Sequence, residues 1–536
     1  MNVPGESKNL MKKLFTLFAV VFSALVFSAG MPAANLAPVP PSVESITPEE
    51  LRMHLEFLAS DELGGRYTLA PNFAISSRYL AAHLKSYGFR GAAKNGDFLQ
   101  YFDVVSSRPD PARTSLALTM DGATTNYELG DVFSFDTSFS GTAAGPVVFV
   151  GRGISSPAQK YDDYAGLDVK GKIVLIAGGT PPEGVDASKL SDAEEGAGAA
   201  AAHGAAGVLS IPTSRFARFI NDKSLKERLL NRDNVRLAAN DDSKLPRLTL
   251  TRAVAEKLLA QAGLSLKALN DSEKERRSLK PVVLNATARL SVAFQDHRVK
   301  TQNVVGVLEG ADPKLKNEYV VFSAHYDHLQ TASNGDVFHG ADDDGSGTVA
   351  ILAIARAMAK DPPRRSILIV FHAGEELGLL GSEYNTDVAP VVPLDKVVAD
   401  LNIDMIGRSK PAGDQEEADT RLTDARSVYL VGSDRISEEL HQLSETTNGE
   451  FQKLRLDYHY NDPSNPERIY FRSDHWNYAK HGIPVIFYFD GTHVDYHRTT
   501  DTVDKIDFNK MTNITRLVFE TGWRIANLDH RLEKSK

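Results

Sequence analysis

Histidine, carboxylate and tyrosine side chains follow apolar segments in the second half of the chain, and their types are those that hold metals or transfer protons. Beyond the carboxyl ends of strands is where open α/β sheets bind their ligands, so we expect these side chains to converge in one crevice. Four such segments are 319–324, 366–371, 397–403 and 483–489, and the side chains after them include His325, Asp327, Glu375, Glu376, Asp404, Tyr496 and His497. A further loop, 340–347, carries three consecutive aspartates with Asp343 in the middle.

Several ionised carboxylates need a counter-charge before they can share one crevice, because like charges at short range repel each other. Three carboxylates and one hydroxide would balance two divalent cations, which in two-metal hydrolysis stand about 3.5–4 Å apart. The chain has no cysteine, so nitrogen and oxygen ligands must hold any metal. We therefore expect two Zn²⁺ ions, with Mn²⁺ or Co²⁺ as substitutes.

The elements that position these side chains follow an alternating strand and helix pattern. The apolar segments are apolar at successive positions, which is typical of strands buried on both faces of a largely parallel sheet. Helices are predicted between them at 348–359 and 437–446. Near the start of the chain, Thr47 and Glu50 form a capping box for a helix that begins at Pro48, and a second helix is predicted over 73–87.

From about residue 113 the pattern changes to short strand-like runs, such as 114–119 and 147–150, separated by turn residues. This texture predicts a β-rich insert over 119–286, which interrupts an α/β domain formed by 43–118 and 287–536.

The first thirty-odd residues read as a targeting segment. Lys8, Lys12 and Lys13 precede the apolar run 14–29, and small residues and prolines follow. We predict a cleaved signal peptide over 1–34. The alternative is a membrane anchor, but the run is shorter than the roughly 20 residues of a spanning helix. The protein is thus expected to be exported, periplasmic or secreted, with no stable membrane insertion after cleavage.

Composition excludes several classes of protein. Of 536 residues, 42% are hydrophobic and 24% charged, which fits neither a disordered chain nor a multi-span membrane protein. The formal charge of −10, without clustered Lys and Arg, argues against nucleic-acid binding. The absence of cysteine also excludes disulfides and a cysteine nucleophile.

Five motifs together resemble the dizinc exopeptidases of metallopeptidase family twenty-eight. They are SAHYDHL (323–329), GADDDGSG (340–347), AGEELGLLGS (373–382), NIDMIG (402–407) and DYHRTTDTVDKI (495–506). The opening LASDELGGR (58–66) also resembles this family, and the insert is similar to a protease-associated domain. The resemblance implies an α/β fold with a mixed, mostly parallel sheet flanked by helices, and the activity of a secreted bacterial aminopeptidase on peptides.

Carried over residue by residue, the resemblance implies two metal sites that share Asp343. His325 and Asp404 would complete one site, and Glu376 and His497 the other. Glu375 would be the general base that takes a proton from the attacking water and returns it to the leaving amine.

Three further residues receive supporting roles. Asp327 would orient the imidazole of His325, Tyr496 would donate to the developing oxyanion, and Asp501 would hold the loop that presents His497. The remaining residues of these motifs are predicted to be structural: the histidines as hydrogen-bonded or pocket-lining groups, the aspartates as turn or helix-cap residues. These are His328, His339, His372, His475, Asp342 and Asp344.

Three alternative functions stay open. A carboxypeptidase of the same fold would need a cation to clamp the substrate carboxylate, for which Arg472 and Arg408 are the candidates. The others are a non-catalytic receptor-like protein and a glutaminyl-cyclase-like acyl transferase. The sequence favours no particular oligomeric state.

Overall fold

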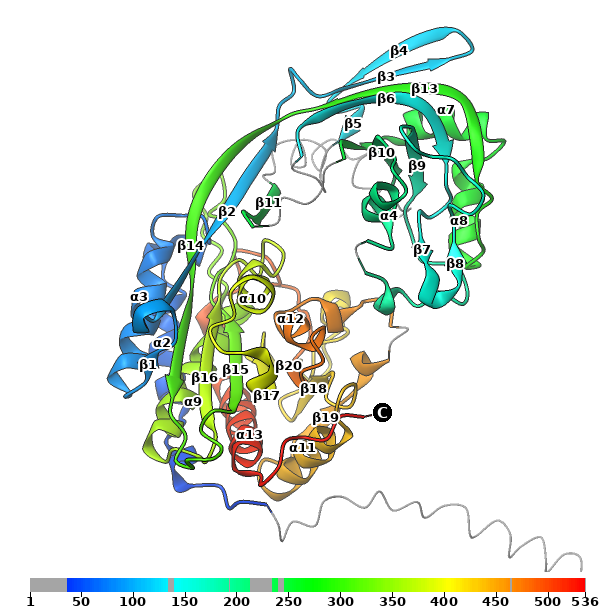
Figure 1. Ribbon diagram of the computed structural model, residues 1–536. Coiled ribbons are helices and arrows are strands. Elements are labelled where there is room, and N and C mark those ends of the chain that lie inside the picture. Colours follow the sequence, from blue (N-terminus) through cyan, green and yellow to red (C-terminus); the bar gives the residue numbers. More distant parts are fainter. Residues whose placement is uncertain are drawn as a thin grey trace, which may run out of the picture. The chain divides into compact units, whose positions relative to one another are not determined.

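A computed structural model describes residues 36–133, 139–191, 193–212, 234–239, 245–462 and 465–535. The predicted signal peptide lies outside these described residues. The chain divides into two compact units (Figure 1). The first is built from Met1–Gln100, Asn303–Glu375 and Gly381–Lys536, and the second mainly from Tyr101–Gln302.

The first unit contains a mixed sheet whose central strands are parallel. β15 pairs in parallel with β16 and β17, and β17 pairs in parallel with β20, whereas β14 and β18 are antiparallel to their inner neighbours. In sheet order the strands are β14 (Phe294–Leu308), β16 (Ser366–His372), β15 (Tyr319–His325), β17 (Val397–Ile403), β20 (Val485–Phe489), β18 (Ser427–Val431) and β19 (Arg455–Asp457), and β1 (Arg90–Gly91) pairs with β14. The predicted mixed, mostly parallel sheet is confirmed.

Helices flank this sheet. α9 and α13 pack against β15 and β17, and α12 packs against β17 and β20. Every residue of β16 and β17 is buried, as expected for strands covered on both faces. The helices of the first unit are α2 (Pro48–Leu58), α3 (Phe73–Ser86), α9 (Gly347–Lys360), α10 (Leu380–Glu383), α11 (Glu438–Glu450), α12 (His475–Ala479) and α13 (Phe508–Asn527).

Local sequence signals explain where several of these helices begin. The hydroxyl of Thr47 accepts a hydrogen bond from the backbone N–H of Glu50 at the start of α2, and Ser437 caps α11 in the same way. α2 buries Leu51, Leu55 and Leu58 on one face. α13 was not among the predicted elements, although its apolar residues recur at helical spacing.

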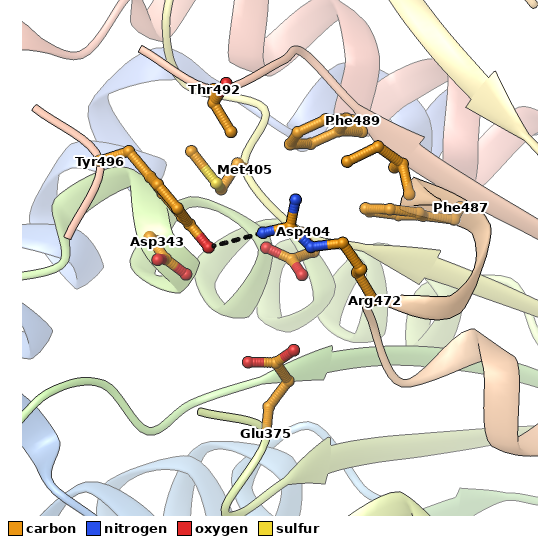
Figure 2. Close-up of a pocket in the computed structure, with 10 residues that line it drawn as sticks. Asp343, Glu375, Asp404, Met405, Arg472, Phe487, Phe489, Thr492 and Tyr496 are labelled. Atoms are coloured by element: carbon orange, nitrogen blue, oxygen red, sulfur yellow. Dashed lines mark hydrogen bonds between the residues drawn. The ribbon is translucent and has the colours of Figure 1, made fainter. Parts of the chain in front are cut away.

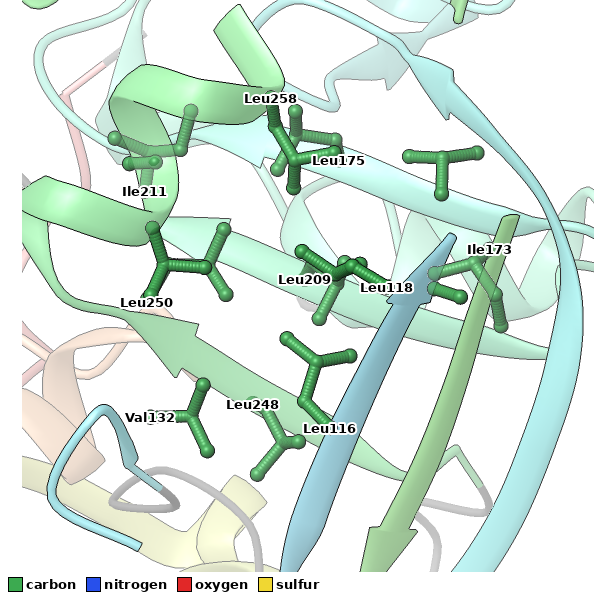
Figure 3. Close-up of a cluster of buried hydrophobic side chains, with 14 of the residues drawn as sticks. Leu116, Leu118, Val132, Ile173, Leu175, Leu209, Ile211, Leu248, Leu250 and Leu258 are labelled. Carbon is green, nitrogen blue, oxygen red and sulfur yellow. The ribbon is translucent and has the colours of Figure 1, made fainter. Parts of the chain in front are cut away.

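The second unit has its own sheet and core. Its strands lie in the order β4 (Ala123–Glu128), β3 (Ser115–Met120), β13 (Val282–Val292), β6 (Gly141–Phe149), β9 (Ile173–Ala177), β10 (Gly207–Ile211), β12 (Arg247–Leu250) and β5 (Val132–Phe133). Leucine and isoleucine side chains from the inner strands pack together with Leu258 of α7 (Figure 3).

The remaining elements of this unit are short, apart from the long strand β2. They are β2 (Leu99–Pro109), which pairs with β11 (Asn234–Leu237), the β7 (Ser155–Ser156) and β8 (Tyr161–Asp162) pair, α4 (Gly196–Ala202), α7 (Arg252–Gln261) and α8 (Leu266–Lys274).

The boundaries of the units lie outside the predicted insert 119–286. One strand, β14, begins at Phe294 in the second unit and ends at Leu308 in the first. The boundary between the units therefore falls inside a strand, where the sequence pattern does not change. The strands predicted at 114–119 and 147–150 correspond to β3 and the end of β6. Among the described helices, none is long and apolar enough to cross a bilayer.

Candidate metal centre

The predicted side chains extend from the carboxyl ends of neighbouring parallel strands. β15 and β16 end level with each other, because His325 pairs with His372 across the ladder. His325 is the last residue of β15, Glu375 follows β16 by three residues, and Asp404 directly follows β17. Asp343 lies in a helical turn, Ala341–Ser346, that leads into α9.

One group of three side chains has the chemistry and spacing of a metal site. The ligand atoms of His325, Asp343 and Asp404 all lie within 4.8 Å of one another, and all three residues are buried. The Nε2 atom of His325 is 3.3 Å from Oδ1 of Asp343 and 3.5 Å from Oδ1 of Asp404. The structure thus brings together the three residues that the resemblance assigned to one zinc.

A second group shares Asp343 with the first. It consists of His328, Asp343 and Glu376, whose ligand atoms also lie within 4.8 Å of one another. Nδ1 of His328 is 3.7 Å from Oδ2 of Asp343, and Nε2 of His497 is 3.0 Å from the same oxygen. Two imidazoles therefore stand at the carboxylate oxygen where only His497 was expected.

His328 reaches this position because the chain beyond β15 stays extended. Its backbone forms a parallel bridge with Tyr67, which holds His328 beside the aspartate loop. The sequence prediction gave His328 a structural role, and the structure places it among the possible ligands. The bridge joins residues far apart in sequence, so local pattern gives no sign of it.

Glu375 lies next to the first group. Its Oε2 atom is 3.8 Å from Nε2 of His325, and its side chain is 12% exposed, so the carboxylate stands at the boundary between the buried ligands and solvent. Gly374 adopts a φ of +76°, which favours glycine, in the turn that delivers Glu375.

Asp327 supports both His325 and Glu375, but not in the way predicted. The backbone carbonyl of Asp327, not its carboxylate, lies within hydrogen-bonding distance of Nδ1 of His325, at 3.1 Å; the nearer carboxylate oxygen is 3.8 Å away. The carboxylate instead accepts hydrogen bonds from the hydroxyl of Thr68, at 2.8 Å, and from the backbone N–H of Glu375, at 3.2 Å. It therefore fixes the segment that carries the predicted base.

Arg66 joins the two loops that carry the ligands. Its buried guanidinium donates hydrogen bonds to four backbone carbonyls. One carbonyl belongs to the segment 326–328, which follows β15, and two belong to residues at the start of the loop that carries Asp343. The acceptors are Tyr326 at 3.0 Å, Leu58 at 2.7 Å, His339 at 2.7 Å and Gly340 at 2.9 Å.

The aspartates on either side of Asp343 hold backbone N–H groups, as predicted for turn and cap residues. Asp344 accepts from Gly347 and Met405, and Asp342 accepts from Gly407. Asp501, expected to support the His497 loop, accepts from the backbone N–H groups of Asp342 and Asp343 instead. Its main effect is thus on the loop that carries Asp343.

Burial and neighbouring charges shift the protonation equilibria of the centre in opposite directions. Burial would raise the pKa of the Asp343 carboxyl, but the imidazoles of His325 and His497, 3.3 and 3.0 Å from its oxygens, hold that pKa well below its usual range. Burial, assisted by the charge of Asp404, raises the pKa of Asp344 well above its usual range. The centre therefore concentrates negative charge on Asp343, the residue common to both groups.

A pocket opens onto this centre (Figure 2). Asp343, Glu375 and Asp404 line it together with four apolar side chains, Met405, Ile469, Phe487 and Phe489, and with Thr492, Arg472 and Tyr496. Arg472 and Tyr496 reach toward each other across the pocket, and the guanidinium donates to the hydroxyl at 3.4 Å. The apolar lining residues were not among the predicted site residues, because single apolar residues in strands and loops carry no chemical signature.

The two arginines considered as carboxylate clamps differ in their surroundings. Arg408 donates to Asp495 at 2.7 Å and lies 3.7 Å from a carboxylate oxygen of Asp501. Its side chain is only 12% exposed, and these protein carboxylates already neutralise its charge. Arg472 is the one that faces the pocket.

The donor set fits divalent metal ions. Nε2 of His325 and Oδ2 of Asp343 are buried and have no well-oriented hydrogen bond within the described part of the chain. A buried polar atom without such a bond is unfavourable unless an ion or water satisfies it. Imidazole nitrogen with carboxylate oxygen is a donor combination that suits zinc.

Comparison with known proteins identifies relatives of the region that holds this centre. Residues 303–522 match the family model described as Peptidase family M28. The chain is 26% identical over 258 residues to Leucine aminopeptidase 2 of Arthroderma otae, covering 44% of this chain and 47% of that protein. It is 32% identical over 141 residues to Aminopeptidase YwaD of Bacillus subtilis, covering 26% and 29%. The chain thus spans less than half the length of either relative.

A solved structure shares the fold. An aminopeptidase from Aneurinibacillus sp. strain AM-1 aligns over 92% of this chain and 97% of its own, with a TM-score of 0.53 and 20% identity. At that identity the comparison supports the shared fold alone.

Proposed function

We propose that the protein is a zinc-dependent exopeptidase that removes residues from the free amino end of peptides, because residues 303–522 match the family model described as Peptidase family M28. One observation carries the proposal. The buried group His325, Asp343 and Asp404 lies beside Glu375, and Asp343, Asp404 and Glu375 line one pocket, so metal ligands and a proton acceptor face the same space. The relatives named as aminopeptidases support the same choice.

The ligand sets favour two zinc ions, with manganese or cobalt as substitutes. His325 and Asp404 would hold one ion, Glu376 and an imidazole from His497 or His328 the other, and Asp343 would contribute to both. When bound, such ions polarise a peptide carbonyl and lower the pKa of water.

Glu375 performs the proton transfer in this proposal. Its carboxylate is partly exposed and close to the ligand group, so it takes a proton from the attacking water and passes it to the departing amine. The bond from its backbone N–H to Asp327 fixes its position. Tyr496, from the opposite side of the pocket, donates its hydroxyl to the oxygen of the cleaved carbonyl.

The proposal includes export of the protein. The basic and apolar start of the sequence, Lys8 to residue 29, supports a signal peptide and a periplasmic or secreted location. The position and β-rich composition of the insert support a protease-associated domain.

A mass-spectrometric digest tests the proposal. Mature protein loaded with zinc is incubated with three forms of one short peptide: with both ends free, with the amino end acetylated, and with the carboxyl end amidated. A chelator-treated sample of the protein is the control. We expect stepwise loss of residues from free amino ends, abolished by acetylation and by the chelator. Loss from the carboxyl end would establish the carboxypeptidase instead, and no cleavage by fully metallated protein would contradict the peptidase proposal.

Two variants separate the metal ligands from the base. Glu375→Gln is expected to retain zinc but to lose most turnover, by roughly a hundredfold or more, because the proton acceptor is gone. Asp343→Asn is expected to lose zinc as well, since both groups depend on Asp343. Zinc content is measured by elemental mass spectrometry, with Asp395→Asn, whose side chain is 74% exposed, as the control. A Glu375→Gln variant with full activity would rule out this residue as the base.

A further inference from the structure

Arg472 is a cation in the pocket beside the metal centre, and no protein carboxylate neutralises it. Within the described residues its guanidinium forms no ion pair within 4.0 Å, and the one hydrogen bond of that group goes to the neutral hydroxyl of Tyr496, at the long distance of 3.4 Å. Arg408, the other candidate clamp, differs because it is 12% exposed and contacts the carboxylate of Asp495 at 2.7 Å, whereas Arg472 is exposed. The guanidinium of Arg472 is thus left to meet whatever enters the pocket.

Apolar side chains make up much of the rest of the pocket lining. Ile469, Phe487 and Phe489 line it with Met405, and Figure 2 shows the two phenylalanine rings on the same side as the stem of Arg472. Such a wall suits a short aliphatic stem, and the guanidinium suits an anionic end group.

We infer that Arg472 is a specificity-determining residue that binds a carboxylate of the substrate. This inference rests on the proposed function and narrows its substrate class. A planar carboxylate accepts two parallel hydrogen bonds from a guanidinium, a geometry that no neutral side chain reproduces. The substrates are therefore peptides with a carboxylate close to the cleaved bond, and a cationic residue in this pocket is disfavoured.

The carboxylate has two possible sources, the side chain of an acidic first residue or the carboxyl terminus of a very short peptide. The first is tested with Glu-Ala-Ala-amide against Gln-Ala-Ala-amide, which differ only by the charged group. The second is tested with the dipeptide Ala-Ala against its amide. The kcat/KM ratio within each pair measures the preference for the carboxylate, and Ala-Ala-Ala-amide reports the activity that does not depend on it.

In the wild-type protein we expect kcat/KM to be about tenfold higher for the peptide with the carboxylate in at least one of the two pairs. This factor corresponds to the lower limit of the free energy of a hydrogen bond to a charged group. Arg472→Gln is expected to bring that ratio to about 1, and kcat/KM for Ala-Ala-Ala-amide measures separately what the lost bond to Tyr496 costs for a substrate without the carboxylate. Arg472→Lys should keep part of the preference, since it retains the charge but not the planar fork. The matched control is Arg468→Gln, an exposed arginine four residues earlier that lies over the ring of Phe471 and does not line the pocket.

Ratios near 1 in the wild-type protein, or ratios that Arg472→Gln leaves unchanged, overturn the inference while the peptidase function stands. If metallated protein cleaves none of the peptides, the proposed function fails separately. Binding of Glu-Ala-Ala-amide and Gln-Ala-Ala-amide is then compared by calorimetry. Equal affinities for the two peptides overturn the inference. Tighter binding of Glu-Ala-Ala-amide to the wild-type protein, lost in Arg472→Gln, supports it.

Discussion

Replacing Arg66 removes the side chain that connects the two ligand-bearing loops. Arg66 is 1% exposed, and its guanidinium donates to four backbone carbonyls from three separate segments. Methionine would fill much of the same space without any donor. We expect Arg66→Met to destabilise the first unit and to loosen both loops at once.

The size of the effect follows from those four bonds. A hydrogen bond to a charged group contributes about 1.5–3 kcal/mol, so four at the low end correspond to about 6 kcal/mol. Water that enters the vacated space recovers part of this, because carbonyl oxygens accept readily from water. Losing one partner from a buried charged network typically costs about 3–5 kcal/mol, and we expect the free energy of unfolding to fall by that amount.

Tryptophan fluorescence during urea unfolding provides the assay. Both tryptophans of the chain, Trp476 and Trp523, lie in the first unit, so the signal follows that unit. Arg426→Met is the control, because Arg426 also donates to two backbone carbonyls but at an exposed position. Its effect should stay within about 0.5 kcal/mol. A loss below about 1 kcal/mol for Arg66→Met would refute the argument that these bonds join the loops.

Two further predictions concern stability in each unit. Burial raises the pKa of Glu520 to about 8 despite the nearby charges of Arg516 and Arg524. In the unfolded chain the Glu520 carboxyl loses its proton above about pH 4.5, whereas in the folded protein it does so only near pH 8. The free energy of unfolding therefore falls as the pH rises from about 4.5 to about 8. Glu520→Gln should therefore stabilise the first unit by about 1 kcal/mol or more at pH 8 and by much less at pH 5, measured by the same fluorescence assay; an equal effect at both pH values would contradict this. In the second unit, Leu209→Ala in the core of Figure 3 should cost about 2–5 kcal/mol, seen as faster hydrogen exchange across the unit. Val283→Ala, at a side chain that is 62% exposed, should leave exchange unchanged, and similar exchange in both variants would contradict the core assignment.

The sequence predicted the central strands β15, β16, β17 and β20 well because the signal there is local, whereas β14 and β19 were not among the predicted segments. An apolar run that ends in a polar residue is visible without any knowledge of the fold, and β17 begins and ends where it was predicted. The start of α2 was predicted for the same reason, since Thr47 and Glu50 are three residues apart.

Side-chain partners were harder to predict because distant contacts decide them. The position of His328 depends on a bridge to Tyr67, and the carboxylate of Asp327 binds the hydroxyl of Thr68 in place of the neighbouring imidazole. Asp501 likewise supports a loop about 160 residues earlier in the chain. The motifs indicated which residues gather at the metal centre. The partner of each side chain depends on contacts between residues far apart in the sequence.

The four bonds of Arg66 also affect the order of events during synthesis. Three of its acceptors, Tyr326, His339 and Gly340, lie 260 to 274 residues further along the chain. At about 5–20 residues per second, roughly 13–55 s pass between the synthesis of Arg66 and that of these acceptors. The second unit, whose residues come in between, can fold during that interval, whereas α2 and α3 must wait with their apolar faces uncovered. The apolar faces of α2 and α3 therefore stay uncovered at least until α9 has been synthesised, and that of α2 is fully covered only when α13 follows.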